Sequence, residues 1–379
     1  MRTERLADSD YDELMAFLNR AFGFAPEQGF VSFLPKLYRR ENDPCRYQLA
    51  VRESGRICGA AGMVPVRLRA AGEELRCCAV GNVAVAESCR GQGMMSFLMT
   101  QAVRAAQAEE YDFATLGGQR QRYARFGFEP AGFEYAFAIT RANVRHCFGK
   151  ETAPELSVRR ITRENQALLA ETERLHRQQP FHAERGTECF YDTLCSWGYR
   201  PYAVLRGGRQ EGYCLRKDDE IREAVLNDPR DFADMSRALT DAFGDIRICL
   251  PSYERRLICE AGQIAENYRV DRWEKSLVFR FRAVLAAMLK LKAAQEGLDD
   301  GELTALIHGV GGDEALRISV KNGKPEVSAA AAGRPELILS YRDAMELFFS
   351  EFSGYRRSLP AAVRCWFPLP LSMRMADHI

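Results

Sequence analysis

A glycine-rich turn between a short apolar strand and a long helix is the part of this sequence best suited to chemistry. The strand is expected over 82–85 and the helix over 94–110, and the turn reads Arg90-Gly91-Gln92-Gly93. Glycines permit positive φ and a close approach of the backbone to a ligand. Backbone N–H groups that converge at a helix N-terminus bind anions, and the helix dipole adds to the attraction. The turn therefore predicts a binding site for a phosphate group.

Two glycines before a helix are also compatible with a plain connecting turn. A dinucleotide fingerprint would need a third glycine, a nucleoside-triphosphate loop would need Gly-Lys-Ser/Thr, and neither is present. The turn also follows several antiparallel strands, whereas a dinucleotide fold would begin with a βαβ unit. Nicotinamide cofactors and nucleoside triphosphates are therefore poor candidates for the ligand.

A possible proton donor follows in the segment Tyr123-Ala124-Arg125-Phe126-Gly127-Phe128-Glu129. An unperturbed tyrosine has a pKa of about 10, so Tyr123 is protonated at neutral pH and can give up a proton. The alternative is that Tyr123 is a core aromatic residue beside Phe126 and Phe128. The nearby arginines, which are Arg120, Arg122 and Arg125, either form a solvated face or approach an anionic ligand, and their spacing leaves both readings open.

The cysteines and histidines do not predict a metal site. Twelve cysteines are present, but no pair has the C-x-x-C spacing of a zinc ribbon or a thioredoxin-type motif. Most of them lie in apolar, strand-like runs, where cysteine behaves as a small core residue. His176 and His182 have no third ligand at metal spacing. We expect reduced thiols and no bound metal.

Composition limits the partners of the chain. Its 53 basic and 52 acidic residues leave a net charge of +1, so no global field attracts nucleic acid or acidic membrane surface. With 46% hydrophobic and 28% charged residues, the chain is neither disordered nor fibrous. The N-terminus has no apolar h-region, and no run approaches the ~20 residues of a membrane span. We expect a cytoplasmic protein without nucleic-acid or membrane partners.

The first part of the chain predicts a mixed α/β sheet. Asp8-Ser9-Asp10 precedes a helical stripe that ends near Gly23, and hairpin turns are expected at Ser54-Gly55 and Ala71-Gly72. The order helix, antiparallel strands, strand–turn–helix–strand is typical of such a sheet. The further elements expected here are strands over 47–53, 56–64, 66–69, 74–78, 113–116 and 135–140, the last closing the sheet, and a short helix over 120–126.

Two further regions follow a linker expected over 145–157, which contains Pro154. The second region predicts an antiparallel meander over 199–205, 210–215 and 221–226, then a helix over 228–243 and a strand over 246–250. This order partly repeats the order of elements in the first region, without the glycine turn. Pattern alone leaves open whether the two regions arose by internal duplication. The third region predicts helices over 284–294 and 340–352 and a hairpin at Asn322-Gly323, a small α+β module.

The glycine turn, its helix, the strand over 113–116 and the segment from Tyr123 to Glu129 resemble a GCN5-related N-acetyltransferase. More narrowly, they resemble the enhanced intracellular survival (Eis) group, which carries Tyr-x-Arg-Phe-Gly-Tyr/Phe at this place. That group is tripartite. The resemblance implies an α/β (α+β) chain with two tandem acetyltransferase-like mixed sheets and flanking helices. Its parts would be an acetyl-CoA-binding domain over 1–145, a similar region without the cofactor turn over 146–282, and a sterol-carrier-like domain over 283–379.

The resemblance also implies roles for single residues, with acetyl-CoA as cosubstrate and no metal. Tyr123 would be the general acid that protonates the departing thiolate, and the terminal carboxylate of Ile379 would be the base. Two departures stand out: Ser88 replaces the Gln or Arg of the wider family's signature, and the chain does not end in an aromatic residue. The residues implied to bind the cofactor are Val83, Ala84, Val85, Arg90, Gly91, Gln92, Gly93, Met94, Met95, Ser96, Gly118 and Gln119.

The resulting hypothesis is an acetyl-CoA-dependent N-acetyltransferase that acts on an amine. An aminoglycoside-like molecule, a polyamine or a protein lysine would suit the resemblance, and a homo-oligomer is expected from it. The alternative is a lipid-binding carrier whose transferase region is vestigial. It would depend on the C-terminal module, because sterol-carrier modules bury apolar ligands under a helix.

Overall fold

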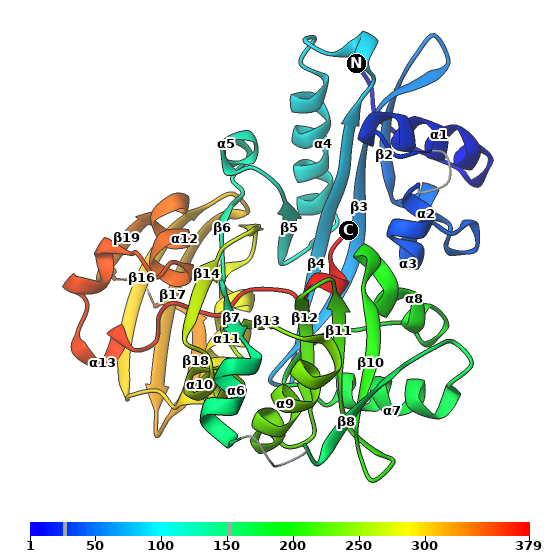
Figure 1. Cartoon of the computed structure of the whole chain (residues 1–379). Coiled ribbons are helices and arrows are strands. Elements are labelled where there is room, and N and C mark those ends of the chain that lie inside the picture. Colours follow the sequence, from blue (N-terminus) through cyan, green and yellow to red (C-terminus); the bar gives the residue numbers. More distant parts are fainter. Residues whose placement is uncertain (26–28, 150–153, 332) are drawn as a thin grey trace.

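The computed structural model describes residues 1–25, 29–149, 154–331 and 333–379, which form three packed units, each built on one sheet (Figure 1). The first sheet has the order β1-β2-β3-β4-β5-β15-β6, with β9 beside β3. Its strands are β1 (Glu4–Arg5), β2 (Gln48–Glu53), β3 (Arg56–Ala70), β4 (Glu73–Val85), β5 (Phe113–Gly117), β6 (Glu129–Pro130), β9 (Phe181–Ala183) and β15 (Glu274–Val278). Its helices are α1 (Tyr11–Phe22), α2 (Phe30–Phe33), α3 (Pro35–Tyr38), α4 (Met94–Ala108) and α5 (Arg120–Tyr123).

Local signals account for most of this unit. Gly23 takes the left-handed conformation directly after α1, and Ala71 and Gly72 have positive φ at the tip of the β3–β4 hairpin. Glycine accepts this conformation at low cost, whereas at Ala71 it costs roughly 1–2 kcal/mol. The strands expected over 66–69 and 82–85 are not separate, because they form parts of the long strands β3 and β4.

The second sheet has the order β14-β7-β13-β12-β11-β10-β8. Its strands are β7 (Glu134–Ile139), β8 (Leu156–Arg160), β10 (Arg200–Arg206), β11 (Arg209–Lys217), β12 (Glu220–Leu226), β13 (Ile246–Pro251) and β14 (Asn267–Asp271). Its helices are α6 (Arg141–Phe148), α7 (Gln166–Arg177), α8 (Phe190–Cys195), α9 (Phe232–Phe243) and α10 (Arg255–Ile264). The linker predicted over 145–157 is wrong at both ends, because α6 extends to Phe148 and β8 begins at Leu156. Residues 150–153 lie outside the described part of the chain.

The first two units exchange strands. β7 does not close the first sheet as expected, because it pairs with β13 in the second sheet, where Ile139 lies opposite Ile246. β15 lies in the first sheet instead, with Leu277 opposite Ala114 of β5. Strand pairing therefore passes in both directions across the domain limit predicted at residue 145. That limit and the one predicted at residue 282 stay predictions.

The two sheets repeat one topology. Each has an antiparallel meander, then a parallel pair whose strands are joined through a helix: β4 and β5 through α4, and β12 and β13 through α9. The connection before α9 contains Asp228-Pro229, where the first unit has its glycine turn. This common order supports the internal duplication that pattern alone left open.

The third unit is a four-stranded sheet in the order β18-β17-β16-β19, covered by helices. The predicted hairpin at Asn322-Gly323 is present between β17 and β18, whereas β16 and β19 were not foreseen. Its elements are β16 (Gly301–Gly309), β17 (Gly312–Lys321), β18 (Lys324–Ala329), β19 (Leu337–Ser340), α11 (Phe281–Glu296), α12 (Tyr341–Phe349) and α13 (Ala361–Arg364). Among the described residues, no helix combines the length and the apolar character needed to cross a membrane.

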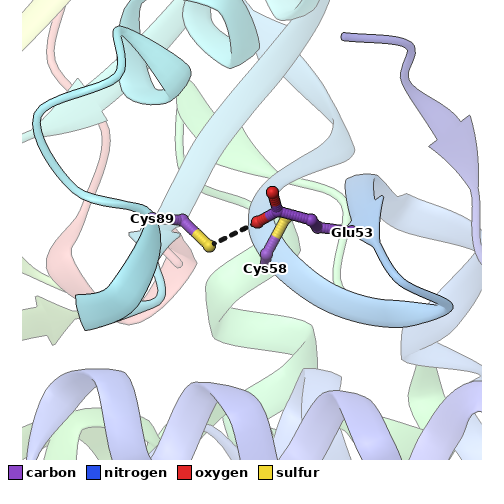
Figure 2. A group of neighbouring side chains, drawn as sticks. All are labelled: Glu53, Cys58 and Cys89. Carbon is purple, nitrogen blue, oxygen red and sulfur yellow. Dashed lines mark hydrogen bonds between the residues drawn. The ribbon is translucent and has the colours of Figure 1, made fainter.

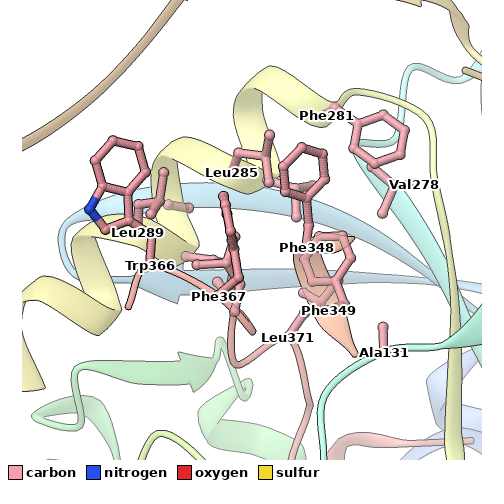
Figure 3. Packing of buried hydrophobic residues seen from close by; sticks show 14 of the residues in the cluster. Ala131, Val278, Phe281, Leu285, Leu289, Phe348, Phe349, Trp366, Phe367 and Leu371 are labelled. Atoms are coloured by element: carbon pink, nitrogen blue, oxygen red, sulfur yellow. The ribbon is translucent and has the colours of Figure 1, made fainter. Parts of the chain in front are cut away.

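Side chains fill the space between α11, α12 and the segment after α13 (Figure 3). Phe281, Phe348 and Trp366 are fully buried there, and Val278 and Ala131 of the first unit belong to the same cluster. The third unit therefore packs directly on the first. From it the chain runs back between the units and ends beside β3 and β4, as Figure 1 shows.

Candidate active site

The predicted glycine turn has the geometry of an open anion cradle. Gly91 and Gly93 have φ of 80° and 77°, a region that L side chains rarely adopt, and Gly93 is the N-cap of α4. A Cβ added at either glycine would meet no heavy atom within 4 Å, so the space in front of the turn is open. The N–H of Phe97 bonds to the carbonyl of Gly93 at 3.0 Å. The N–H groups of Met94, Met95 and Ser96 precede that first bond and are the orphan donors of a helix N-terminus.

β4 offers an open edge next to this cradle. It pairs with β5 only from Cys77 to Ala79, and among the described strands nothing pairs with that edge from Val80 to Val85. On its other edge, the register against β3 shifts near Asn82, whose φ is 42°. The Asn82 side chain is held by Tyr38 Oη at 2.7 Å and by Gln48 Oε1 at 2.8 Å. The strand of Val83, Ala84 and Val85 can therefore hydrogen-bond an extended ligand as an added strand would.

Tyr123 packs beside this edge. Its side chain is buried in a cluster that includes Val80, Phe128 and, at its border, Val83 and Met95. The ring also lies against Gly118, where a Cβ would be 2.8 Å from the Tyr123 Cε2 atom. Burial raises the pKa of the Tyr123 phenol above its usual value, and Arg122 offsets only part of this rise. The ring thus belongs to the core, as the alternative interpretation held, while its hydroxyl stays protonated at neutral pH.

The structure distinguishes between the arginines of this segment. Arg125 Nη2 donates to Ser96 Oγ at 2.6 Å and lies 3.6 Å from Met95 Sδ, which places a cation over the first turn of α4. Arg120 instead pairs with Glu129 at 2.7 Å. Arg125 is therefore the arginine placed to meet an anion in the cradle. Arg90 and Gln92 are exposed in the turn, and Gln119 is exposed at the start of α5.

The C-terminus of the chain reaches the same strand. A Cβ at Gly81 would lie 2.7 Å from Ile379 Cγ1 and 2.9 Å from Ile379 O, so the last residue lies against β4 next to the shifted register at Asn82. Trp197 Nε1 donates to the carbonyl of His378 at 3.2 Å, and Lys36 Nζ donates to the carbonyl of Ala376 at 2.5 Å. The first and second units thus both hold the tail in place.

A buried ion-pair network anchors this tail. Arg185 pairs with Asp377 at 2.7 Å and with Glu223 at 2.8 Å, and all three side chains are at most 4% exposed. Burial alone would raise the pKa of the Asp377 carboxyl, but the charge and hydrogen bonds of Arg185 outweigh it and hold that pKa well below its usual range. Breaking a buried pair typically costs about 3–5 kcal/mol. The path of the tail is therefore strongly specified.

A cavity of about 350 Å³ opens beside Ile379, between α3, the middle of β3 and the segment before α8. Its lining side chains include three cations, of which Lys36 has its pKa lowered to about 8, chiefly by burial. Carboxylates outnumber these cations. The lining carboxylates are Glu41, Asp43, Glu184, Glu188 and Asp377, and the cations are Lys36, Arg46 and Arg185.

Residues 2–131 match the family model described as acetyltransferase (GNAT) domain. This part of the chain is similar to GNAT acetyltransferase domains. The match ends just before β7, the strand that leaves for the second sheet. Domains of this kind transfer acyl groups from an acyl-coenzyme A, which agrees with the anion cradle and the open edge of β4. A search of curated proteins found no match to the chain.

Several solved structures share the architecture of the whole chain. A GCN5-related N-acetyltransferase from Anabaena variabilis has a TM-score of 0.70 at 14% identity, with 100% of both chains covered. One from Kribbella flavida has 0.67 at 15% identity, covering 100% of this chain and 98% of the other. Eis1 from Mycobacterium abscessus has 0.64 at 13% identity, with 100% of both chains covered. At these identities the likeness concerns the fold, and it confirms the mixed α/β tandem architecture.

The structure brings together residues that sequence reasoning named separately. Val83, Met95 and Tyr123 meet in one cluster, Gly118 touches Tyr123, and Ile379 reaches the strand that carries Val83, Ala84 and Val85. Sequence reasoning missed the side chains that hold the tail. Lys36, Trp197 and Arg185 come from distant segments, and no local signal in the sequence marks them.

Proposed function

We propose that this N-acetyltransferase moves an acetyl group from acetyl-CoA to the amine of a cationic small molecule bound in the cavity beside Ile379. The observation that carries the proposal is the position of the terminal residue. Ile379 lies against β4, the strand with the open edge, and it lines the acidic cavity as well. A thioester held along β4 and an amine held in the cavity would therefore meet near Ile379.

The residues present fit acetyl-CoA. The N–H groups from Gly91 to Ser96 would hold the pyrophosphate together with the Arg125 guanidinium, and the strand of Val83, Ala84 and Val85 would hydrogen-bond the pantetheine amides. Gly118 and Gln119 would lie further along the cofactor. When bound, acetyl-CoA supplies an acetyl group activated as a thioester.

Two groups of this chain would handle the protons. The Ile379 carboxylate would accept a proton from the ammonium group of the acceptor. This step is needed because only the neutral amine can attack a carbonyl carbon. Tyr123, kept protonated by burial, would donate to the departing sulfur. General acid–base groups of this kind contribute about 10²–10⁴-fold in rate.

The lipid-carrier alternative has no observation in its favour. Phe281, Phe348 and Trp366 fill the space that a lipid would need between α11 and α12 (Figure 3). A ligand there would have to displace packed core side chains, and even inserting extra methylene groups into a well-packed core typically costs about 1–3 kcal/mol. The likeness of this module to a sterol carrier, the homo-oligomer and the cytoplasmic location stay predictions.

Calorimetry with acetyl-CoA and a thiol-release assay with a panel of amines test the proposal. We expect acetyl-CoA binding, and turnover that favours di- and triamines over monoamines because the cavity is acidic. Glu188→Gln should raise KM for a triamine by up to about fivefold, since exposed charges contribute up to about 1 kcal/mol. Glu266→Gln, an exposed carboxylate outside the cavity, is the control. Absent cofactor binding, or no preference for polyamines, would overturn the proposal.

A further inference from the structure

Three side chains from separate segments converge beneath the glycine turn (Figure 2). Glu53 ends β2, Cys58 lies in β3, and Cys89 ends the short helical turn Glu87–Cys89 just before Arg90. One carboxylate oxygen and the two sulfurs all lie within 4.8 Å of one another. Within the described ranges this is the one group of three or more His, Cys, Asp or Glu side chains that meets in this way.

The chemistry of the three donors suits zinc. Zinc binds thiolate sulfur at about 2.3 Å and carboxylate oxygen at about 2.0–2.2 Å, so tetrahedral geometry places neighbouring ligands roughly 3.5–3.8 Å apart. Cys89 Sγ already lies 3.1 Å from Glu53 Oε2. Small side-chain rotations would therefore bring all three atoms to bonding distance. We propose that Glu53, Cys58 and Cys89 bind a zinc ion whose fourth position is open to water.

Exposure of the three side chains favours entry of an ion. Both cysteines are 4% exposed, while Glu53 reaches solvent. A mixed set of two thiolates and one carboxylate selects zinc over calcium or magnesium, which prefer oxygen ligands alone. On binding, each thiol gives its proton to solvent and each sulfur forms a bond to the ion, with no change in oxidation state.

A regulatory disulfide between the two cysteines is the weaker reading of this cluster. Cys89 Sγ donates to Glu53 Oε2 at 3.1 Å and Cys58 Sγ donates to the carbonyl of Val51 at 3.3 Å, so each thiol is directed to an oxygen atom rather than to the other sulfur. A disulfide would also leave Glu53 without a role. A bound cation, by contrast, deprotonates the thiols that coordinate it.

The zinc ion would stiffen the cradle. Cys89 directly precedes the turn, and Cys58 Sγ lies 3.7 Å from Sδ of Met94, the first residue of α4. The Ala86 N–H also bonds to the carbonyl of Cys58 at 2.8 Å. An ion at this place connects the β2–β3 hairpin to Cys89, just before the turn. Through Cys58 the hairpin also contacts Met94, just after the turn. Zinc should therefore tighten acetyl-CoA binding, a consequence that rests on the proposed function, whereas the site itself does not.

Cobalt(II) titration of the reduced full-length chain tests the site without any activity measurement. We expect a thiolate-to-cobalt charge-transfer band and tetrahedral d–d bands, both removed by stoichiometric zinc. Cys89→Ser should abolish the charge-transfer band from that sulfur and weaken cobalt binding. Glu53→Gln, at an exposed position that leaves the core intact, should lower affinity about tenfold or more, since even partners beyond the ligands contribute 10–100-fold. Cys259→Ser, at an exposed cysteine of α10, is the control and should bind cobalt as the parent does.

Two results would overturn the site: no thiolate band in the reduced parent chain, or a band that both Glu53→Gln and Cys89→Ser leave unchanged. Circular dichroism of each variant verifies the fold, and Glu53→Gln decides the question if the cysteine variants misfold. Calorimetry with acetyl-CoA on the metal-free chain separates the two proposals. Cofactor binding without a cobalt site would reject the zinc site alone, and a cobalt site without cofactor binding would reject the proposed function alone.

Discussion

The phenol of Tyr123 is held in a buried cluster. Gly118 leaves room for its ring, Val80 and Phe128 belong to the same cluster, and burial raises the pKa of its hydroxyl. The sequence could predict the residue and its protonation, because both follow from residue type. The sequence could not predict that Arg125, rather than Arg120, lies at the cradle, because the surroundings of both depend on how α5 folds back toward α4.

Tyr123→Phe should lower kcat about 10²-fold or more while the affinity for acetyl-CoA stays within about twofold, because only the proton donor is lost. A thiol-release assay measures the rate, and calorimetry measures the affinity. Tyr111→Phe is the matched control, since Tyr111 is a buried tyrosine of the same cluster. Equal rates in Tyr123→Phe and the parent would remove Tyr123 from the mechanism.

At the scale of elements, β4 connects the parts of the site. One segment of this strand contacts the tail at Gly81 and carries the open edge up to Val85, and the strand leads into the turn before α4. The absence of a side chain at Gly81 is what lets Ile379 approach. The backbone there does not need glycine, because its φ is not positive.

Gly81→Ala should therefore displace the tail rather than unfold the strand. Its Cβ would lie 2.7 Å from Ile379 Cγ1, and misplacing a reacting group by about 1 Å can cost up to about 10²-fold in rate. We expect kcat to fall about tenfold or more with acetyl-CoA affinity retained. Gly262→Ala in α10, where an added Cβ meets no atom within 4 Å, should behave as the parent. A variant at Gly81 with full activity would contradict the role of Ile379.

The elements that could be predicted from the sequence are those whose ends are marked by turn residues. The hairpins at Ser54-Gly55 and Asn322-Gly323 and the start of α4 after Gly93 were predictable because turn chemistry is local. The partners of β7 and β15 were not predictable, since both strands are short and nothing in their residues indicates which sheet they join. Glu53, Cys58 and Cys89 also escaped detection, because the fold brings them together and their spacing along the chain resembles no known motif.

At the scale of the whole molecule, buried ionisable groups make stability depend on pH. Burial lowers the pKa of His176 to about 3, with Arg185 acting in the same direction. The neutral ring lies 2.8 Å from the carbonyl of Ala183 through Nε2. Between pH 6.5 and 3 the unfolded chain therefore binds more protons than the folded chain, so the free energy of unfolding rises with pH in that window. The depressed pKa of Asp377 acts in the same sense below about pH 3.9, the usual value for an aspartate.

The chain should accordingly lose stability as the pH falls below about 6.5, by up to about 1.4 kcal/mol per pH unit from His176 alone. Urea unfolding at a series of pH values measures this slope. His176→Gln should flatten it, whereas His146→Gln, at an exposed histidine of α6, should leave it unchanged. The same pH dependence of the unfolding free energy in the parent and in His176→Gln would contradict the neutral, buried state of His176.

The exchange of β7 and β15 has a practical consequence for anyone who divides this protein. A fragment that stops at residue 145 would carry β7 away from its neighbours and would leave β5 and β6 without the strand that joins them. The complementary fragment would lack the strand that joins the edge strand β14 to its sheet, because β13 and β14 meet only through β7. We therefore expect neither fragment to fold alone, so an engineered fusion would need to include both regions.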